Sequence, residues 1–234
     1  MRLESDPSAF PSALPPSTTD PKVIAEHDWA AFGELEKMTN HWDRPGWTPS
    51  TRAYYWMLTF PDAAALADLA QDCQTKLKHL RFDDIAPEGL HLTLGRIGLV
   101  DQIPATHPEL LAAAVHDSAP SAFALDAIPL TASRGALRFS VAPWDPVVAL
   151  HETLSHITAK AGSSLRRPTS ALRPHIGISY CNRPIAASTV RESLRPLRSL
   201  PSAEVPVEHI RIVELRREDR AYRWRTLHSV RLCP

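Results

Sequence analysis

Two segments of the chain alternate apolar residues with polar or small ones at a period of two, a pattern typical of a half-buried β-strand. The first is LHLTLGRIG, residues 90–98, and the second is RPHIGISYC, residues 173–181. Because successive side chains on a strand point to opposite faces, His91, Thr93 and Gly95 are expected to share one face of the first strand. Its other face is apolar and suits burial in a core.

The second segment repeats this arrangement 84 positions later. His175, Gly177 and Ser179 are expected on one face, and Ile176 and Ile178 on the other. A histidine at the head of one strand is most often structural. The recurrence of the same pattern predicts two related strands that bring two imidazoles to one site.

The rest of the hydrophobic pattern predicts helices and further strands between and around these two segments. Helices are expected from Asp20-Pro21 to about residue 38, after Pro61-Asp62 to about residue 80, from about residue 108, over 146–161 and over 186–195. Further strands are expected over 53–60, 122–132, 136–143, 205–215 and 221–232. Strands and helices alternate while hairpins recur, so we expect an α+β fold. It would have two internally duplicated lobes, with antiparallel-rich sheets flanked by helices around a central cleft.

Composition is ordinary for a globular protein, with 44% hydrophobic and 22% charged residues in 234. No apolar run approaches the roughly 18 residues that a membrane-spanning helix needs. Residues 1–20 are rich in Pro and Ser and lack the pattern of a signal peptide, so we expect a disordered tail there, an N-terminal helix over 21–40 and the main domain over 41–234. The three cysteines are far apart, which argues against a disulfide framework or a cysteine zinc site. We expect a protein of the reducing cytoplasm.

Charge is balanced overall but uneven along the chain. Residues 164–234 contain fourteen Arg, no Lys and six acidic residues, a net charge of +8, so residues 1–163 carry −8. Guanidinium groups suit phosphate oxygens, although solvated surface arginines would give the same asymmetry. Zero net charge favours short oligonucleotides or mononucleotides over long nucleic acids as ligands.

Two opposed imidazoles are suited to phosphodiester chemistry. An imidazole titrates near neutrality, so one ring can accept a proton from the attacking oxygen while its charged partner protonates the departing oxygen. Hydroxyl and backbone N–H donors between the rings can hold the non-bridging oxygens as charge develops. This chemistry calls for no metal and no cofactor.

The same residues resemble a known family. HLTL and HIGI look like the paired H-x-T/S-x motifs of the two-histidine (2H) phosphoesterase superfamily, and HWDRPGW, YYWMLTF, LHLTLGRIG and RPHIGISYCN together resemble its 2′-5′ RNA ligase-like branch of actinobacterial type. The resemblance covers roughly residues 41–234. It implies the two-lobed 2H phosphoesterase fold and activity on RNA 2′,3′-cyclic phosphate ends or 2′-5′ linkages. It assigns the acid and base roles to His91 and His175 and the phosphate-holding hydroxyl to Thr93.

The second motif departs from the family pattern at Gly177, which supplies no hydroxyl where the family has Thr or Ser. Ser179, two residues along, or the backbone of Gly177 itself could replace it as a phosphate contact. The loss of one donor to a developing charge costs about 10²–10³-fold in rate. The alternative hypothesis is a nucleotide- or RNA-end-binding module with weakened or lost catalysis.

Other candidate residues have two open interpretations. Arg134, at a hairpin tip, and Arg173, before His175, could bind phosphate or simply lie at the surface. The pair Trp42 and Trp47 and the run Tyr54, Tyr55 and Trp56 could stack bases or pack in the core. Tyr180 is expected in the core. His151 and His156 lie five positions apart on a helix and are therefore poor metal ligands.

The sequence therefore predicts a metal-independent cyclic phosphodiesterase, a hydrolase whose reaction could run in reverse as a 2′-5′ RNA ligase. Expected partners are RNA ends, short oligonucleotides or cyclic nucleotides, with no membrane partner. A further hypothesis gives the N-terminal 40 residues a role in binding another protein. Nothing in the sequence indicates an oligomer, and we expect a monomer.

Overall fold

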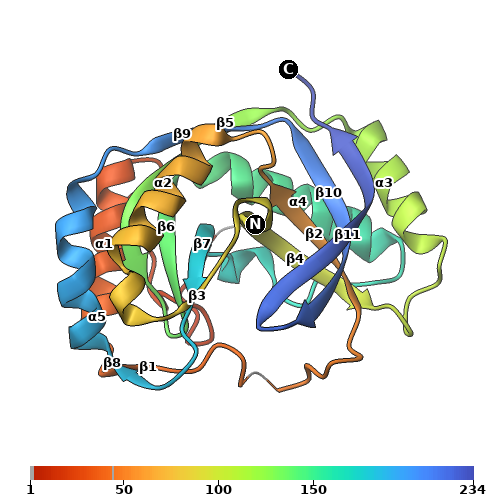
Figure 1. The fold of residues 1–234 in the computed structure, drawn as a ribbon. Helices are drawn as coiled ribbons and strands as arrows, with labels where there is room; N and C mark the ends of the chain where they lie inside the picture. The colour runs from red at the N-terminus through yellow and green to blue at the C-terminus, as the bar shows by residue number, and fades with distance from the viewer. Residues whose placement is uncertain (1–2, 44) are drawn as a thin grey trace.

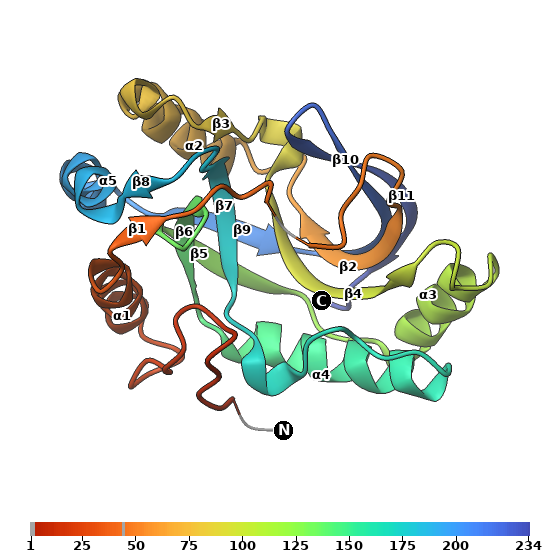
Figure 2. The same cartoon turned by 90° about the horizontal axis from the view of Figure 1, so that it is seen from below.

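Two antiparallel sheets make up the protein, and each contains one of the two histidine-bearing strands (Figure 1). The computed structural model describes residues 3–43 and 45–234. The first sheet has the order β11-β10-β2-β4, with β11 at Ala221–Arg231, β10 at His209–Glu218, β2 at Ala53–Thr59 and β4 at His91–Leu99. It curves into a half-barrel (Figure 2).

The second sheet has the order β3-β7-β6-β5-β9. Its strands are β3 (Asp83–Asp84), β7 (His175–Tyr180), β6 (Ala136–Ala142), β5 (Phe123–Ala132) and β9 (Ala203–Val207). A separate pair, β1 (Lys37–Met38) and β8 (Ile185–Ala186), joins the N-terminal region to the chain after β7. Strands β4 and β7 contact each other where the two sheets meet, so the two histidine strands lie at the centre of the molecule.

Five α-helices in the described part of the chain cover these sheets. They are α1 (Pro21–Gly33), α2 (Ala64–Lys76), α3 (His107–Ser118), α4 (Asp145–Lys160) and α5 (Ala187–Leu194). Helices α1, α2 and α5 contact the second sheet, whereas α3 and α4 contact β11 and β4 of the first (Figures 1 and 2). No helix among the described residues is both long enough and apolar enough to cross a membrane.

The expected α+β architecture is confirmed, and most element boundaries fall within a few residues of the predicted ones. One predicted strand, 205–215, is divided into β9 and β10. The division has a topological reason, because β9 belongs to the second sheet and β10 to the first. The chain therefore crosses from one sheet to the other at Glu208.

The N-terminal helix is shorter than the sequence predicts. Asp20 caps α1 by accepting hydrogen bonds from the backbone N–H groups of Lys22 and Val23. The helix ends at Gly33, and residues 37–38 pair with β8 instead of continuing it. Tertiary pairing thus replaces helical structure over the last residues of the predicted segment.

The structure also differs from the expected disordered tail over residues 3–20; residues 1 and 2 lie outside the described part. Ala9 is fully buried, and the Arg173 guanidinium donates hydrogen bonds to the backbone oxygens of Glu4, Pro11 and Ser12. The Arg138 side chain likewise donates to the backbone oxygen of Phe10. Composition did not reveal this order because it depends on buried arginines elsewhere in the chain that need acceptors.

The core is one large hydrophobic cluster with a small second one. The small cluster is centred on Met57, Val213 and Leu215, with aromatic side chains packed around it. It lies on the opposite face of the first sheet from Trp56, which is in the main core. The face that carries the small cluster is therefore the face that Thr93 shares, since Thr93 pairs with Met57.

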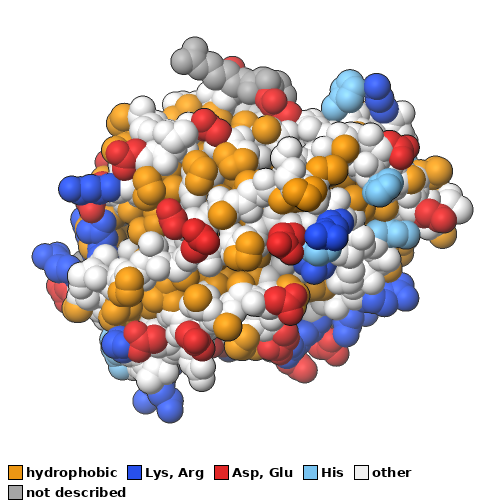
Figure 3. Space-filling model, turned by 90° about the horizontal axis from the view of Figure 1, so that it is seen from above, with side chains coloured by type: hydrophobic (Ala, Val, Ile, Leu, Met, Phe, Trp, Pro, Cys, Tyr) orange, Lys and Arg blue, Asp and Glu red, His pale blue; other side chains and the backbone are white. Residues whose placement is uncertain are grey.

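The face seen from above combines both signs of charge. Lys and Arg side chains lie mainly toward its left and right margins, with hydrophobic and acidic groups between them (Figure 3). On this face the arginine-rich C-terminal third does not produce one continuous basic patch.

Candidate active site

Both histidine strands contain a β-bulge directly after the third motif position. In β4, Thr93 pairs with Met57 and Gly95 pairs with Trp56, which leaves Leu94 as the extra residue. A bulge of this kind bends the strand and changes the direction of the following side chains. Thr93 and Gly95 therefore do not share one face, and the simple alternation expected for residues 91–95 is wrong beyond Thr93.

Strand β7 has the equivalent irregularity. Gly177 pairs with Arg138 and Ser179 pairs with Leu137, so Ile178 is the extra residue. Adjacent residues of β6 point to opposite faces, and Gly177 and Ser179 do so too. The two strands thus share a β-bulge at the same motif position as well as a sequence motif.

The two imidazoles are oriented in the same way. Nδ1 of His91 lies 2.7 Å from the backbone oxygen of Gly89, and Nδ1 of His175 lies 2.8 Å from the backbone oxygen of Arg173. A carbonyl oxygen only accepts hydrogen bonds, so Nδ1 carries the proton in each ring. In the neutral ring the lone pair is then on Nε2, which becomes the atom that exchanges protons.

The environments of the two rings differ. His91 is half-buried, and burial lowers the pKa of its imidazole, with the hydrogen bond to Gly89 opposing the shift. The Trp224 ring meets the His91 ring edge-on, with 5.4 Å between centroids. His175, in contrast, is exposed. The neutral form is therefore favoured at His91.

The motif positions between the histidines also differ. Thr93 is exposed on the same face as His91 and offers a hydroxyl. At Gly177, an added Cβ would lie 3.3 Å from Cδ1 of Ile85, which is a tight contact. A side chain at this position therefore requires Ile85 to move by a few tenths of an ångström.

Ser179 does not replace the missing hydroxyl. It is 1% exposed and donates a hydrogen bond of 2.7 Å to Oδ1 of Asp84. The bulge at Ile178 turns it away from the face of Gly177. The expectation that Ser179 binds phosphate is therefore wrong, and only the backbone of Gly177 stays as a candidate at this position.

Arg173 is not a phosphate ligand either. It is 6% exposed, and its five N–H groups are directed at five backbone oxygens: Glu4, Pro11, Ser12, Ser170 and Leu172. Its role is to attach the N-terminal segment beside the start of β7. Arg134 is exposed, with its guanidinium 5.5 Å from the centroid of the Phe10 ring, and its proposed contact with phosphate stays a prediction.

An aromatic cluster around Arg217 adjoins the face of β11 that carries Trp224. The cluster consists of His41, Trp42, Trp47, Tyr180 and Tyr222. The Arg217 guanidinium packs on Trp42, Trp47 and Tyr222 and donates to the Tyr222 hydroxyl and the Trp42 backbone oxygen. Because Tyr180 is in β7 and Tyr222 is in β11, the cluster joins the two sheets.

The aromatic residues of β2 have different positions from those expected of a base-stacking surface. Trp56 is fully buried and Tyr54 is 7% exposed in the main core. Tyr55 is half-buried on the face of the small cluster. Tyr180 is buried, as expected. Arg217 and Ile85 were not identified from the sequence, because their roles arise from contacts between segments far apart in the chain.

His151, on α4, is fully buried. Its Nδ1 is 2.8 Å from the hydroxyl of Thr169, six residues before the start of β7. Burial lowers the pKa of His151 to about 4, and an interaction with the backbone of Leu94 opposes this shift only in part. Among the described residues no group of three His, Cys, Asp or Glu side chains is placed to hold a metal ion.

Known structures share this fold. The apo crystal structure of Escherichia coli LigT has a TM-score of 0.57 at 16% identity, over 79% of this chain and 99% of that chain. The structure of TT0787 of Thermus thermophilus has a TM-score of 0.56 at 17% identity, over 77% of this chain and 97% of that chain. At these identities the likeness concerns the fold.

Sequence comparison gives the family. No curated protein matches the chain. The family model described as the 2′-5′ RNA ligase superfamily matches residues 60–219, which include both histidine strands. The match covers more than half of the sequence, and the chain therefore belongs to the 2′-5′ RNA ligase superfamily, the 2H phosphoesterases.

Proposed function

We propose that the protein is a metal-independent phosphodiesterase that opens 2′,3′-cyclic phosphate ends of RNA or cleaves 2′-5′ linkages. Joining ends through a 2′-5′ bond is the same chemistry in reverse. The single observation that carries this proposal is the matched orientation of His91 and His175. Each ring is fixed through Nδ1 by a carbonyl two residues before it, on two adjacent strands.

In the proposed reaction, Nε2 of His91 accepts a proton from a water molecule as its oxygen attacks phosphorus. The bond from phosphorus to the 2′ or 3′ oxygen breaks, and that oxygen takes a proton from charged His175. His91 suits the base role because burial keeps its imidazole neutral at pH 7. The acid role then belongs to His175, whose side chain is exposed.

Thr93 and the backbone at Gly177 would hold the non-bridging oxygens. The Thr93 hydroxyl shares the face of His91, two residues along the strand. A hydroxyl in this place stabilises charge that develops on phosphate oxygens. With only one hydroxyl between the two motifs, we expect turnover below that of a site with two.

Structures of the related fold support a ligand of nucleotide size. E. coli LigT has been crystallised with 3′-AMP, ATP and NADP+. The corresponding ligand class for this chain is an RNA end or a short oligonucleotide.

A second candidate function is binding without turnover. It is favoured by the absence of a hydroxyl at Gly177, where an added Cβ would be in tight contact with Ile85.

The test is hydrolysis of 2′,3′-cyclic nucleotides and of a short RNA ending in a cyclic phosphate, in EDTA, by the wild type, His91→Ala and His175→Ala. Turnover that survives the chelator and is lost in both variants supports the enzyme. Binding of either substrate by a wild type that gives no product identifies a binding protein instead.

A further inference from the structure

A polar hollow of about 700 Å³ lies where β4 ends, beside the C-terminal turn of α4. Its polar lining comprises Arg96, Gln102, Ser163, Ser164 and Arg166. No Asp or Glu is among the described residues that line it. The hollow therefore has two positive charges and no compensating carboxylate.

Arg96 is directed to the face that carries the candidate catalytic residues. Thr93 pairs with Met57 and Arg96 pairs with Tyr55, because Leu94, which lies between them on β4, is bulged out of register. Met57 and Tyr55 are two apart on β2 and share a face, so Thr93 and Arg96 do as well. Because their partners on β2 are two residues apart at about 3.3 Å per residue, Arg96 is roughly 7 Å along the sheet from Thr93.

Arg166 is held next to Arg96 by the backbone. The N–H of Arg166 donates to the backbone oxygen of Arg96 at 3.1 Å, which places the loop after α4 along the free edge of β4. In the described part of the structure, neither guanidinium makes a hydrogen bond or an ion pair with another residue. Both groups are therefore available to a ligand.

The end of α4 opposes an anion here only weakly. A helix C-terminus carries the equivalent of about half a negative charge. Two of its last carbonyls already accept hydrogen bonds, from the N–H groups of Gly162 and Ser163. The two guanidinium groups together carry two full positive charges, which exceed the remaining partial negative charge at the end of α4.

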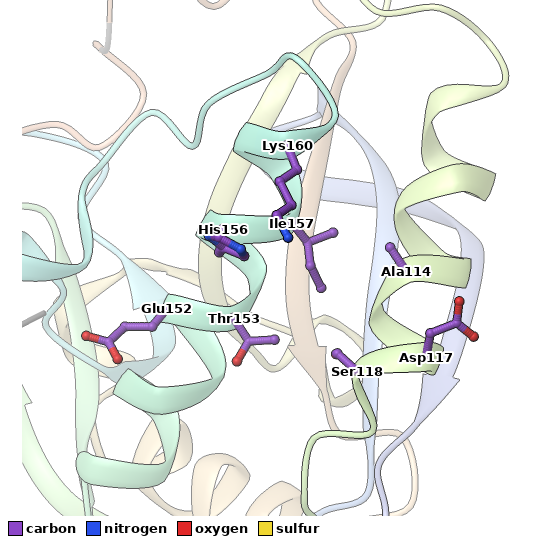
Figure 4. Close-up of a pocket in the computed structure, with 8 residues that line it drawn as sticks. All are labelled: Ala114, Asp117, Ser118, Glu152, Thr153, His156, Ile157 and Lys160. Atoms are coloured by element: carbon purple, nitrogen blue, oxygen red, sulfur yellow. The ribbon is translucent and has the colours of Figure 1, made fainter.

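A second hollow of about 630 Å³, between α3 and α4, shows the contrast. Asp117 and Glu152 line it together with His156 and Lys160, so its charges have both signs (Figure 4). Figure 4 shows Asp117 on α3 and Lys160 on α4 at its two sides. This hollow is lined by carboxylates as well as a lysine, whereas the charged side chains that line the hollow at Arg96 are both arginines.

We propose that Arg96 and Arg166 form a second phosphate-binding site, which binds a backbone phosphate of an RNA strand whose reacting end lies at Thr93. This inference rests on the proposed function and narrows its substrate class to an oligonucleotide with at least one phosphate besides the reacting one. A cyclic mononucleotide reaches the histidines but not this site.

The first experiment compares two substrates, a 2′,3′-cyclic mononucleotide and a four-nucleotide RNA that ends in a cyclic phosphate. It uses the wild type, Arg96→Ala, Arg166→Ala, the double variant and the control Arg195→Ala, which removes an exposed arginine from the short helix Arg195–Ser199. We expect each single variant to lower kcat/KM for the RNA about 10-fold or more, because charged hydrogen bonds are lost. The cyclic mononucleotide should react within about two-fold of the wild type. An unchanged ratio between the two substrates overturns the proposal.

The second experiment needs no turnover. Binding of a fluorescent four-nucleotide RNA with a 3′-phosphate is measured by anisotropy at several salt concentrations. We expect the double variant to weaken binding and to reduce the salt slope by about 0.7 for each phosphate that it no longer binds, the value for a single strand. If the wild type hydrolyses neither substrate, the proposed function fails while this measurement still decides the phosphate site. RNA binding that is unchanged in the double variant rules the site out.

Discussion

Strands β4 and β7 are the two halves of one repeated arrangement, and they differ in what they present to a substrate. Both begin with a histidine whose Nδ1 is bonded to a carbonyl two residues earlier, and both bulge after the third motif position. Only β4 adds an exposed hydroxyl, at Thr93. The backbone placement of the imidazoles is thus the same in both halves, whereas the hydroxyl at the third motif position is present only in β4.

The surroundings of the two strands deepen the difference. His91 is half-buried beside Trp224, whereas His175 is exposed and follows Arg173, which attaches the N-terminal segment. At Gly177 in β7, an added Cβ would be in tight contact with Cδ1 of Ile85. We infer that β4 is the half that holds the phosphate and keeps a neutral base, and that β7 supplies mainly the acid.

The largest expected effect is the loss of either histidine. His91→Ala and His175→Ala should each lower kcat by about 10²–10⁴-fold, because each removes one proton-transfer partner. The double variant should be little worse than the worse single variant, since the two groups act as a unit. His116→Ala, an exposed histidine at the end of α3, is the matched control. Equal activity of His175→Ala and the wild type would remove β7 from the chemistry.

Replacement of the β4 hydroxyl comes next. Thr93→Val keeps the shape of the side chain and should lower kcat by about 10²–10³-fold, because a donor to the developing charge is lost. Thr189→Val, at an exposed position of α5, is the control for a lost threonine hydroxyl away from the site. A change confined to KM would show that Thr93 binds the ground state and the transition state equally well.

The third effect concerns His151, whose Nδ1 lies 2.8 Å from the hydroxyl of Thr169, six residues before β7. Its pKa is about 4 in the folded protein and about 6.5 when unfolded, so the unfolded chain binds more protons between these values. Stability is therefore fully present above pH 6.5 and falls as pH drops toward 4, by at most about 3 kcal/mol from this group.

Urea unfolding at pH 7 and pH 5 measures this loss. His151→Gln should flatten the pH dependence of the free energy of unfolding, and His156→Gln, on the exposed side of the same helix, should not. An equal slope in wild type and His151→Gln would show that other groups cause the acid sensitivity.

The smallest expected effect is that of a substitution that gives β7 the hydroxyl that β4 has. Gly177→Ser supplies the missing hydroxyl, but its Cβ contacts Ile85, so the single substitution should change kcat little. Combined with Ile85→Val, which removes the Cδ1 atom in the tight contact, it should raise kcat by up to about 10-fold, a fraction of the effect of a full donor. Ile85→Val alone is the control. A double variant slower than this control would mean that the Gly177 backbone already makes the phosphate contact.

Much of the fold could be predicted from the sequence. Alternation of apolar residues located β4 and β7, runs of strand-forming residues located β2 and the β5–β6 hairpin, and helical patterns located α2, α4 and α5. The two histidines could be paired because their motifs repeat. These signals are local, since each depends on side chains a few positions apart on one element.

The tertiary structure alone decided which neighbours of the histidines are available. Ser179 and Arg173 have the right residue types at the right spacing, yet Ser179 is bonded to Asp84 and Arg173 to the N-terminal backbone. The bulges at Leu94 and Ile178 arise from pairing with other strands, and they decide which side chains share the face of the candidate catalytic residues. The sequence alone thus determined the two histidine strands, because a strand's own pattern of side chains encodes them. Register, burial and the partners of each polar group depend on segments far away in the chain, and only the folded structure brings those segments together.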